Sequence, residues 1–153
     1  MPALKMRLAT AEDLPAIVHL LADDFLGQQR EDLSEPLNEN YINAFKEIDA
    51  DANNELIVAE LDGKDIGTLQ LTFTPSLSYR GSKRCTVESV RVDTSLRGKG
   101  IGREMMLWAI ERAKEKGCIS MQLTSHKNRE DAHRFYEQLG FAKSHVGMKL
   151  SLK

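Results

Sequence analysis

The residues with the clearest chemical potential lie in a glycine-rich stretch from Val90 to Arg103, with the sequence VRVDTSLRGKGIGR. Gly98, Gly100 and Gly102 allow the backbone to turn tightly and to come close to a ligand. The stretch is typical of a strand that passes through a bend into a helix. The first N–H groups of a helix have no partner within it, and the helix dipole favours negative charge there. The stretch therefore predicts a phosphate-binding loop, although a simple strand-to-helix turn could carry the same glycines.

Two familiar glycine patterns do not fit this stretch. The dinucleotide-binding fingerprint G-x-G-x-x-G requires glycine at position 103, where the chain has arginine, and the P-loop pattern G-x-x-x-x-G-K-[ST] is absent. The sequence RGKGIG at 97–102 does agree with the pattern [RQ]-x-x-G-x-[GA]. A second group lies downstream, with AHRFY at 132–136 followed by GF at 140–141.

Hydrophobic periodicity predicts the elements that must position these groups. Strands are expected at 5–8, 55–61, 66–73, 84–92 and 119–124, with one or two more within 141–152. Helices are expected at 11–22, 38–48, 100–116 and 130–139. Asp62-Gly63-Lys64 predicts a hairpin, and Thr10 with Asp13 resembles a capping box at the start of the first helix. This order indicates one mixed α/β domain with a single sheet over residues 1–153.

With both motifs and this element order, the chain resembles the GNAT superfamily of N-acetyltransferases along nearly its whole length. The run DAHRFY at 131–136 is also similar to aminoalkylphosphonate acetyltransferases of that superfamily. The resemblance implies a mostly antiparallel sheet of six to seven strands with a splayed parallel pair, flanked by about four helices, an α/β fold (α+β in some schemes). It also implies acetyl transfer from acetyl-coenzyme A to a primary amine of a small molecule, by direct attack in a ternary complex.

The resemblance assigns the binding of coenzyme A to three segments. The diphosphate would lie on backbone N–H groups of the glycine loop, and basic side chains there could add charge. The pantetheine arm would pair, like an added strand, with the backbone before the loop. An asparagine near the second motif also contacts the cofactor in many relatives, although here it is shifted by one position. The residues concerned are Val90, Arg91, Val92, Arg97, Gly98, Lys99, Gly100, Ile101, Gly102, Arg103 and Asn128.

The catalytic residues are also expected from this resemblance. Tyr136 corresponds to a tyrosine that can protonate the departing thiolate, and packing as a core aromatic is the alternative. Glu88 is the candidate general base, acting through water, and an ion pair with a nearby base is its alternative. Strict alternation puts Glu88 on the same face as Val90, which predicts burial or a local bulge. The N–H of Val90 or a neighbour would stabilise the oxyanion. His126 and His133 are weaker candidates for the base.

The acceptor amine is expected to enter from the side opposite the cofactor. In the superfamily, the first two helices and their connection build that wall, which here is the acid-rich segment 23–51. Four of its acids could attract a cation, and Tyr41 either lines the pocket or belongs to the core. Solvated faces without a ligand would give the same uneven charge. The acids are Asp23, Asp24, Glu31 and Asp32.

Composition narrows the function classes. With 153 residues, a net charge of −2 and no long apolar run, the chain is expected to be a cytoplasmic protein without a membrane span. Cys85 and Cys118 form no metal-ligand or disulfide pattern, so no metal is expected. The bases of 80–129 lack interleaved aromatic residues, so nucleic acid is not an expected partner. A protein or peptide lysine or N-terminal acetyltransferase and a non-catalytic acyl-coenzyme A sensor remain as alternatives. The resemblance also suggests a homodimer.

Overall fold

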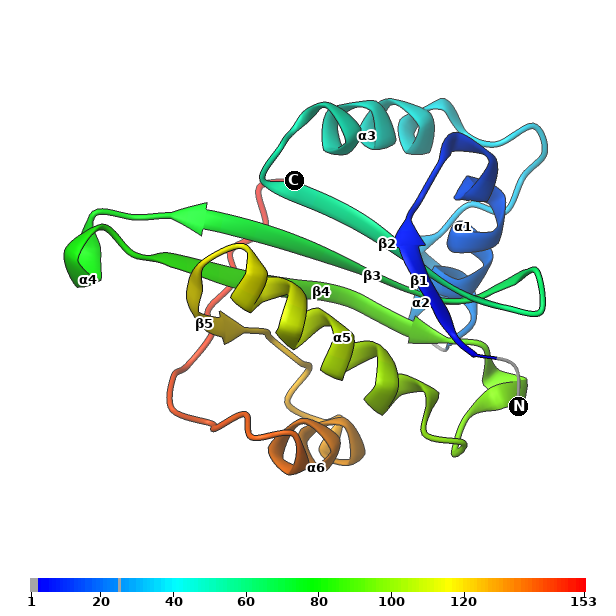
Figure 1. Ribbon diagram of the computed structural model, residues 1–153. Helices are drawn as coiled ribbons and strands as arrows, with labels where there is room; N and C mark the ends of the chain where they lie inside the picture. The colour runs from blue at the N-terminus through cyan, green and yellow to red at the C-terminus, as the bar shows by residue number, and fades with distance from the viewer. Residues whose placement is uncertain (1–2, 25) are drawn as a thin grey trace.

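A five-stranded sheet forms the centre of the computed structural model, which describes residues 3–24 and 26–153 (Figure 1). The strand order follows the chain, and the first four strands are antiparallel. The fifth runs parallel to the fourth. The hairpin after the second strand turns through Asp62 and Gly63, with φ of 52° and 77°, as the Asp-Gly pair predicts. The strands are β1 (Lys5–Leu8), β2 (Asn54–Leu61), β3 (Lys64–Pro75), β4 (Lys83–Val92) and β5 (Cys118–Gln122).

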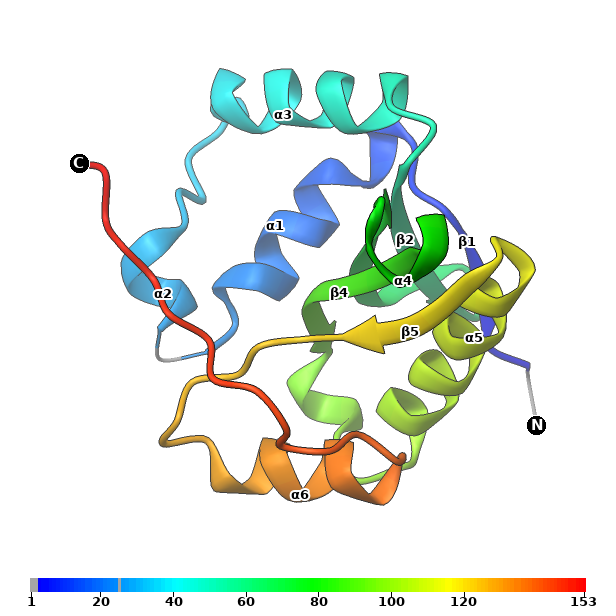
Figure 2. The same ribbon diagram turned by 90° about the vertical axis from the view of Figure 1, so that its left-hand side faces the viewer.

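Helices cover both faces of this sheet (Figure 2). On one face, α5 (Ile101–Glu115) packs Met105 and Met106 against alternate residues of β3, among them Leu69 and Phe73. On the other, α1 (Leu14–Ala22) and α3 (Glu39–Ala50) pack near Val58 of β2. Each fully buried apolar side chain contributes roughly 1.5–3 kcal/mol to the free energy of unfolding. Because successive strand residues point to opposite faces, the alternation along β3 determines which of its side chains α5 covers.

The short helices α2 (Gly27–Arg30) and α4 (Ser78–Gly81) lie outside the helices that periodicity predicts. Two 3₁₀ turns, η1 (Ala11–Asp13) and η2 (Thr94–Leu96), precede α1 and α5. The last helix is α6 (Glu130–Gln138). In the described part of the chain, no helix is both long and apolar enough to cross a bilayer. Cys85 and Cys118 are free.

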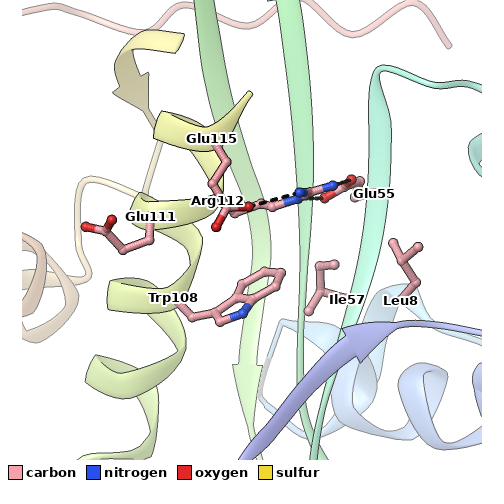
Figure 3. A pocket seen from close by; sticks show the side chains of 7 residues that line it. All are labelled: Leu8, Glu55, Ile57, Trp108, Glu111, Arg112 and Glu115. Carbon is pink, nitrogen blue, oxygen red and sulfur yellow. Dashed lines mark hydrogen bonds and ion pairs between the residues drawn. The ribbon is translucent and has the colours of Figure 1, made fainter. Parts of the chain in front are cut away.

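A pocket of about 170 Å³ lies between the C-terminal half of α5 and strands β1 and β2 (Figure 3). Its floor includes Trp108 and Ile57. One end is closed by Glu55, which is buried and accepts two hydrogen bonds from Arg112, at 2.8 and 2.5 Å. This bidentate pair attaches α5 to β2, so we interpret the pocket as part of the scaffold.

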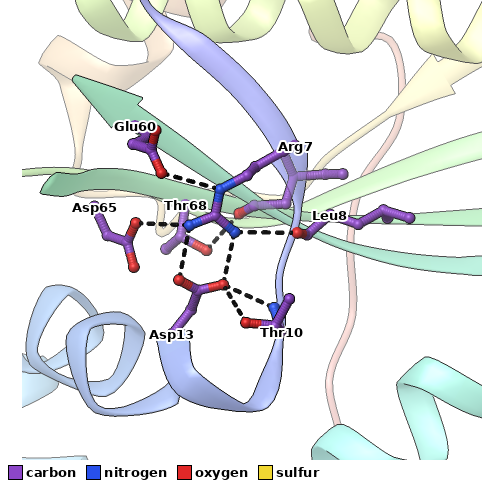
Figure 4. A network of polar contacts seen from close by, with 8 residues as sticks. Arg7, Leu8, Thr10, Asp13, Glu60, Asp65 and Thr68 are labelled. Carbon is purple, nitrogen blue, oxygen red and sulfur yellow. Dashed lines mark hydrogen bonds and ion pairs between the residues drawn. The ribbon is translucent and has the colours of Figure 1, made fainter. Parts of the chain in front are cut away.

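A polar network around Arg7 fixes the start of α1 (Figure 4). The guanidinium donates to both oxygens of Asp13, at 2.7 and 2.8 Å, and to Glu60 and Asp65, each at 3.2 Å. The hydrogen bond from Arg7 holds the pKa of Asp13 well below its usual range, whereas burial and the neighbouring Asp13 raise the pKa of Asp65 to about 6. The capping box of Thr10 and Asp13 is confirmed. One arginine therefore joins β1, the first helix and the hairpin.

The expected strands within 141–152 are wrong for the described chain, so the sheet has five strands instead of six to seven. The C-terminal arm, residues 142–153, is exposed throughout. It passes the chain just after β5, where Gly147 lies beside Thr124, and continues away from the sheet (Figures 1 and 2). Its alternation of apolar and polar residues suits a strand, but a strand also needs a neighbouring backbone to pair with, and the arm pairs with none of residues 3–24 or 26–141.

Candidate active site

The glycine loop has the backbone that its sequence predicts. Gly98 and Gly100 adopt left-handed φ values of 78° and 80°, and α5 begins directly after Gly100. At both glycines, no described atom lies within 4 Å of the position that a Cβ would take. The loop therefore presents bare backbone on its outer side.

The amides of residues 98–103 have no acceptor within residues 3–24 and 26–153. The first bond of this turn runs from Glu104 N to Gly100 O, at 3.1 Å. No side chain caps α5, whose 15 residues align a full helix dipole behind the loop. The side chains of Arg97, Lys99 and Arg103 form no ion pair with the described chain. These free donors and positive charges fit a diphosphate.

The parallel pair β4–β5 opens beside this loop. Its register runs from Lys83 opposite Cys118 to Thr86 opposite Gln122, where β5 ends. β4 continues to Val92, so no strand formed by the described residues lies along that edge at 87–92. The splayed parallel pair is thereby confirmed. An extended ligand can hydrogen-bond to such an edge as an added strand would.

A β-bulge interrupts β4 at the centre of this edge. Gln70 pairs with Glu88 and Thr68 with Arg91, so Ser89 and Val90 together lie opposite a single residue of β3. Ser89 has a φ of 54°, in the left-handed region. Of the two predicted alternatives, burial of Glu88 or a local bulge, the structure shows the bulge. The extra residue moves Glu88 to the face opposite Val90, where its side chain is exposed.

Tyr136 lies on α6 and is half-buried. Its ring contacts Phe135 and Phe141 edge-to-face, with centroids 5.1 and 5.8 Å away. Burial raises the pKa of Tyr136, while the positive charges of Arg129 and Arg91 lower it. Phe135 packs over the start of α5, 3.5 Å from the position of a Cβ on Gly102. The two sequence motifs therefore meet in space.

The remaining candidates lie in the segment between β5 and α6. Asn128 is exposed, and its backbone N–H donates to Nδ1 of His126 at 3.2 Å. Nε2 of His133 lies 2.9 Å from the carbonyl oxygen of His126. These contacts occupy both histidines in local structure, so they do not favour either as the base.

The sequence suggests the side chain of Arg91 only as one possible ion-pair partner of Glu88, and the described chain has no such pair. Thr68, its partner on β3, pairs on the other side with Val58, so Arg91 projects from the face that α1 covers. Its side chain is only 14% exposed, and Nε lies 3.5 Å from a carboxylate oxygen of Asp24. Burial lowers the pKa of Arg91. A charged residue between two valines of a strand was the available signal.

Several acids of the expected acceptor wall already have partners. Tyr41 donates to Glu31 at 2.9 Å and accepts from the N–H of Asp32 at 2.8 Å. Asp32 accepts from Asn38 at 3.0 Å. Asp24 Oδ1 accepts from the N–H of Gly27 at 2.5 Å. These bonds fold the segment between α1 and α3, which leaves Asp23 as the acid of the four with no such bond to a described residue.

In the described chain, no group of three or more His, Cys, Asp or Glu side chains could hold a metal ion. The site thus combines a phosphate-binding loop, an open strand edge, a bulge and a tyrosine. These parts suit an extended anionic carrier whose reactive end lies near Tyr136.

Comparisons with known proteins agree with this geometry. Residues 14–141 match the model of the acetyltransferase (GNAT) family. The chain is 28% identical over 149 residues to an aminoalkylphosphonate N-acetyltransferase of Salmonella typhimurium, covering 95% of this chain and 89% of that one. It is 33% identical over 90 residues to a glucosamine 6-phosphate N-acetyltransferase of Trypanosoma brucei brucei, covering 59% of each. A crystal structure described as a transcriptional regulator from Bacillus halodurans superposes with a TM-score of 0.95 at 54% identity, over 98% of this chain and 100% of that one.

Proposed function

The chain belongs to the acetyltransferase (GNAT) family, and on this premise we propose that it transfers the acetyl group of acetyl-coenzyme A to a primary amine of a small molecule. The observation that carries the proposal is the run of amides at 98–103, which have no acceptor in the described chain and are exposed by two left-handed glycines. We further propose that residues 1–153 act as one domain, in the cytoplasm and as a homodimer.

The binding step uses two parts of the site. The amides of 98–103 would bind the diphosphate, with charge added by Arg97, Lys99 and Arg103. The open edge of β4 at Val90–Val92 would hold the pantetheine arm by main-chain hydrogen bonds. Acetyl-coenzyme A supplies a thioester, whose carbonyl carbon the amine attacks. Because loop and edge are continuous in sequence, a ligand bound to both would have its thioester near the bulge.

The chemical step needs an unprotonated amine, since an ammonium ion has no free lone pair. Glu88 lies on the face that α1 covers and is exposed to solvent, so it would accept the proton through water. The bulge interrupts the β3–β4 ladder at Val90, whose N–H would donate to the carbonyl oxygen. Tyr136 would return a proton to the thiolate. Its raised pKa keeps that proton in place at neutral pH.

A small-molecule acceptor is favoured by the names of the relatives. Both relatives with a named substrate act, by those names, on small amines. The alternative of a protein or peptide amine rests on the acid-rich segment, but three of its acids are already hydrogen-bonded. A non-catalytic sensor of acyl-coenzyme A is a second candidate, because the similar structure from Bacillus halodurans carries a regulator's name.

Calorimetric titration with coenzyme A, followed by thiol release over a panel of amines, tests the proposal. We expect binding and amine-dependent release of free coenzyme A, with turnover strongly reduced in Tyr136→Phe. Binding without turnover on any amine, with Tyr136→Phe equal to the wild type, would support the sensor. A protein that does not bind coenzyme A at all would refute both.

A further inference from the structure

We propose that the acceptor amine carries an anionic group, a phosphate, phosphonate or carboxylate, and that Arg91 binds it. This inference rests on the proposed function and deepens it. Arg91 follows the bulge directly and lies on the same face of β4 as Glu88. The residue is therefore next to the proposed reaction centre, on the side from which the amine is expected to enter.

The hydrogen bonds of Arg91 are incomplete. A guanidinium has five N–H donors. Nη1 donates to the carbonyl of Val90 at 3.0 Å, but the buried Nε has no hydrogen-bond partner in the described chain. Asp24 lies 3.5 Å from Nε, which makes an ion pair without a hydrogen bond. Buried donors are nearly always satisfied, so this one indicates an acceptor that the chain itself does not provide.

The charge around Arg91 also favours an anion. Arg129 and Arg30 lie close enough to disfavour its charged form, and Asp24 is the acid that opposes them. The side chains of Arg30 and Arg129 form no ion pair with residues 3–24 or 26–153. Even with Glu88 on the same face of β4 counted beside Asp24, three arginines against two carboxylates leave an excess of positive charge. Two of these arginines, Arg129 and Arg91, also act on Tyr136. Phosphate, phosphonate and carboxylate are the groups that guanidinium binds best.

This site is separate from the one proposed for the diphosphate of coenzyme A. The glycine loop lies at the start of α5, whereas Arg91 projects from the opposite face of the sheet, toward α1. An anion bound by Arg91 therefore belongs to the other substrate. Binding it would hold the amine at a fixed distance from the bulge, because both contacts lie on one strand.

Steady-state kinetics with matched amine pairs tests the assignment, using 2-aminoethylphosphonate with ethylamine, glucosamine 6-phosphate with glucosamine, and glycine with methylamine. We expect the wild type to prefer an anionic member by about 10- to 100-fold in kcat/KM, since charge-assisted hydrogen bonds are at stake. Arg91→Met should abolish that preference, mainly through KM for the amine, and leave KM for acetyl-coenzyme A unchanged. Arg91→Lys should keep part of it. Arg84→Met, on the same strand away from the site, is the matched control and should keep all of it.

Equal use of both members of every pair by the wild type would overturn the inference, without touching the proposed acetyl transfer. So would an Arg91→Met variant that slows both members alike, because Arg91 would then serve only the ion pair with Asp24. If Arg91→Met does not fold, the preference of the wild type and the Arg91→Lys variant still decide. If the wild type turns over none of the amines, that result would instead refute the proposed function itself.

Discussion

Replacing Gly98 by alanine separates the binding role of the loop from its folding role. Gly98 has a φ of 78° with open space where the Cβ would stand, so the cost to folding is backbone strain alone. Strain of this kind costs about 1–2 kcal/mol for a residue with a side chain. Gly63 in the β2–β3 hairpin is a matched control, because its φ of 77° and its open surroundings are nearly the same. Both variants should therefore lose about 1–2 kcal/mol of unfolding free energy in denaturant titrations.

Their affinities for coenzyme A should differ. Relief of the strain at Gly98 turns the neighbouring amides away from the diphosphate. Each charge-assisted hydrogen bond that is lost is worth about 1.5–3 kcal/mol, which corresponds to an increase in Kd of about 10- to 150-fold. Gly63→Ala should leave Kd within about 2-fold, as measured by calorimetric titration. If Gly98→Ala binds coenzyme A as tightly as Gly63→Ala does, the amides of the loop do not hold the diphosphate.

Three further predictions concern ionisable groups. Tyr136→Phe should lower kcat by about 10²- to 10⁴-fold at unchanged KM for acetyl-coenzyme A. The raised pKa of Tyr136 predicts that any fall in the wild-type rate from tyrosine ionisation is centred above pH 10, and a fall centred below pH 10 that is absent from the variant would contradict this. The pKa of Asp65 is raised from 3.8 to about 6, so the folded state binds the proton of this carboxyl group more tightly than the unfolded state does. The protonated carboxyl therefore stabilises the fold fully below pH 3.8, and this stabilisation is lost as the pH rises through 6. The unfolding free energy of the wild type minus that of Asp65→Asn should therefore fall by about 1–3 kcal/mol between pH 4 and 7, and a difference that is flat with pH would refute the cause given. Glu55→Gln should cost about 2 kcal/mol in denaturant unfolding, and a double-mutant cycle with Arg112→Met should show coupling between the two; additive losses would mean that their bidentate contact contributes nothing.

The sequence predicts the elements of the fold well where periodicity and local chemistry agree. The alternation of β3, the helical spacing of α5, the Asp62-Gly63 turn and the Thr10–Asp13 box all specify their structure within a few neighbouring residues. The glycine loop belongs to the same class, because positive φ at Gly98 is a local property. These features need no knowledge of distant parts of the chain.

The features that the sequence leaves open or misplaces depend on contacts between distant segments. Alternation alone cannot place the bulge at Ser89, which exposes Glu88 and puts Arg91 on the same face. The C-terminal arm has the pattern of a strand, but pairing depends on where the chain leads it after α6. The partners of Asp24 likewise follow from the fold of the α1–α3 connection. In each case the residue types indicated the chemistry that was possible, and the tertiary structure determined which neighbours each residue has.

The packing of Phe135 over Gly102 determines which part of the molecule can vary in length. The distance between Tyr136 and the glycine loop is set by the contact of α6 with α5 at Phe135 and Gly102, and not by the segment 123–129 that leads into α6. Changes in the length of that segment should therefore leave this spacing intact, whereas a side chain larger than alanine at position 102 would push α6 away from α5. The contact acts as a spacer between the two ends of the proposed acyl carrier.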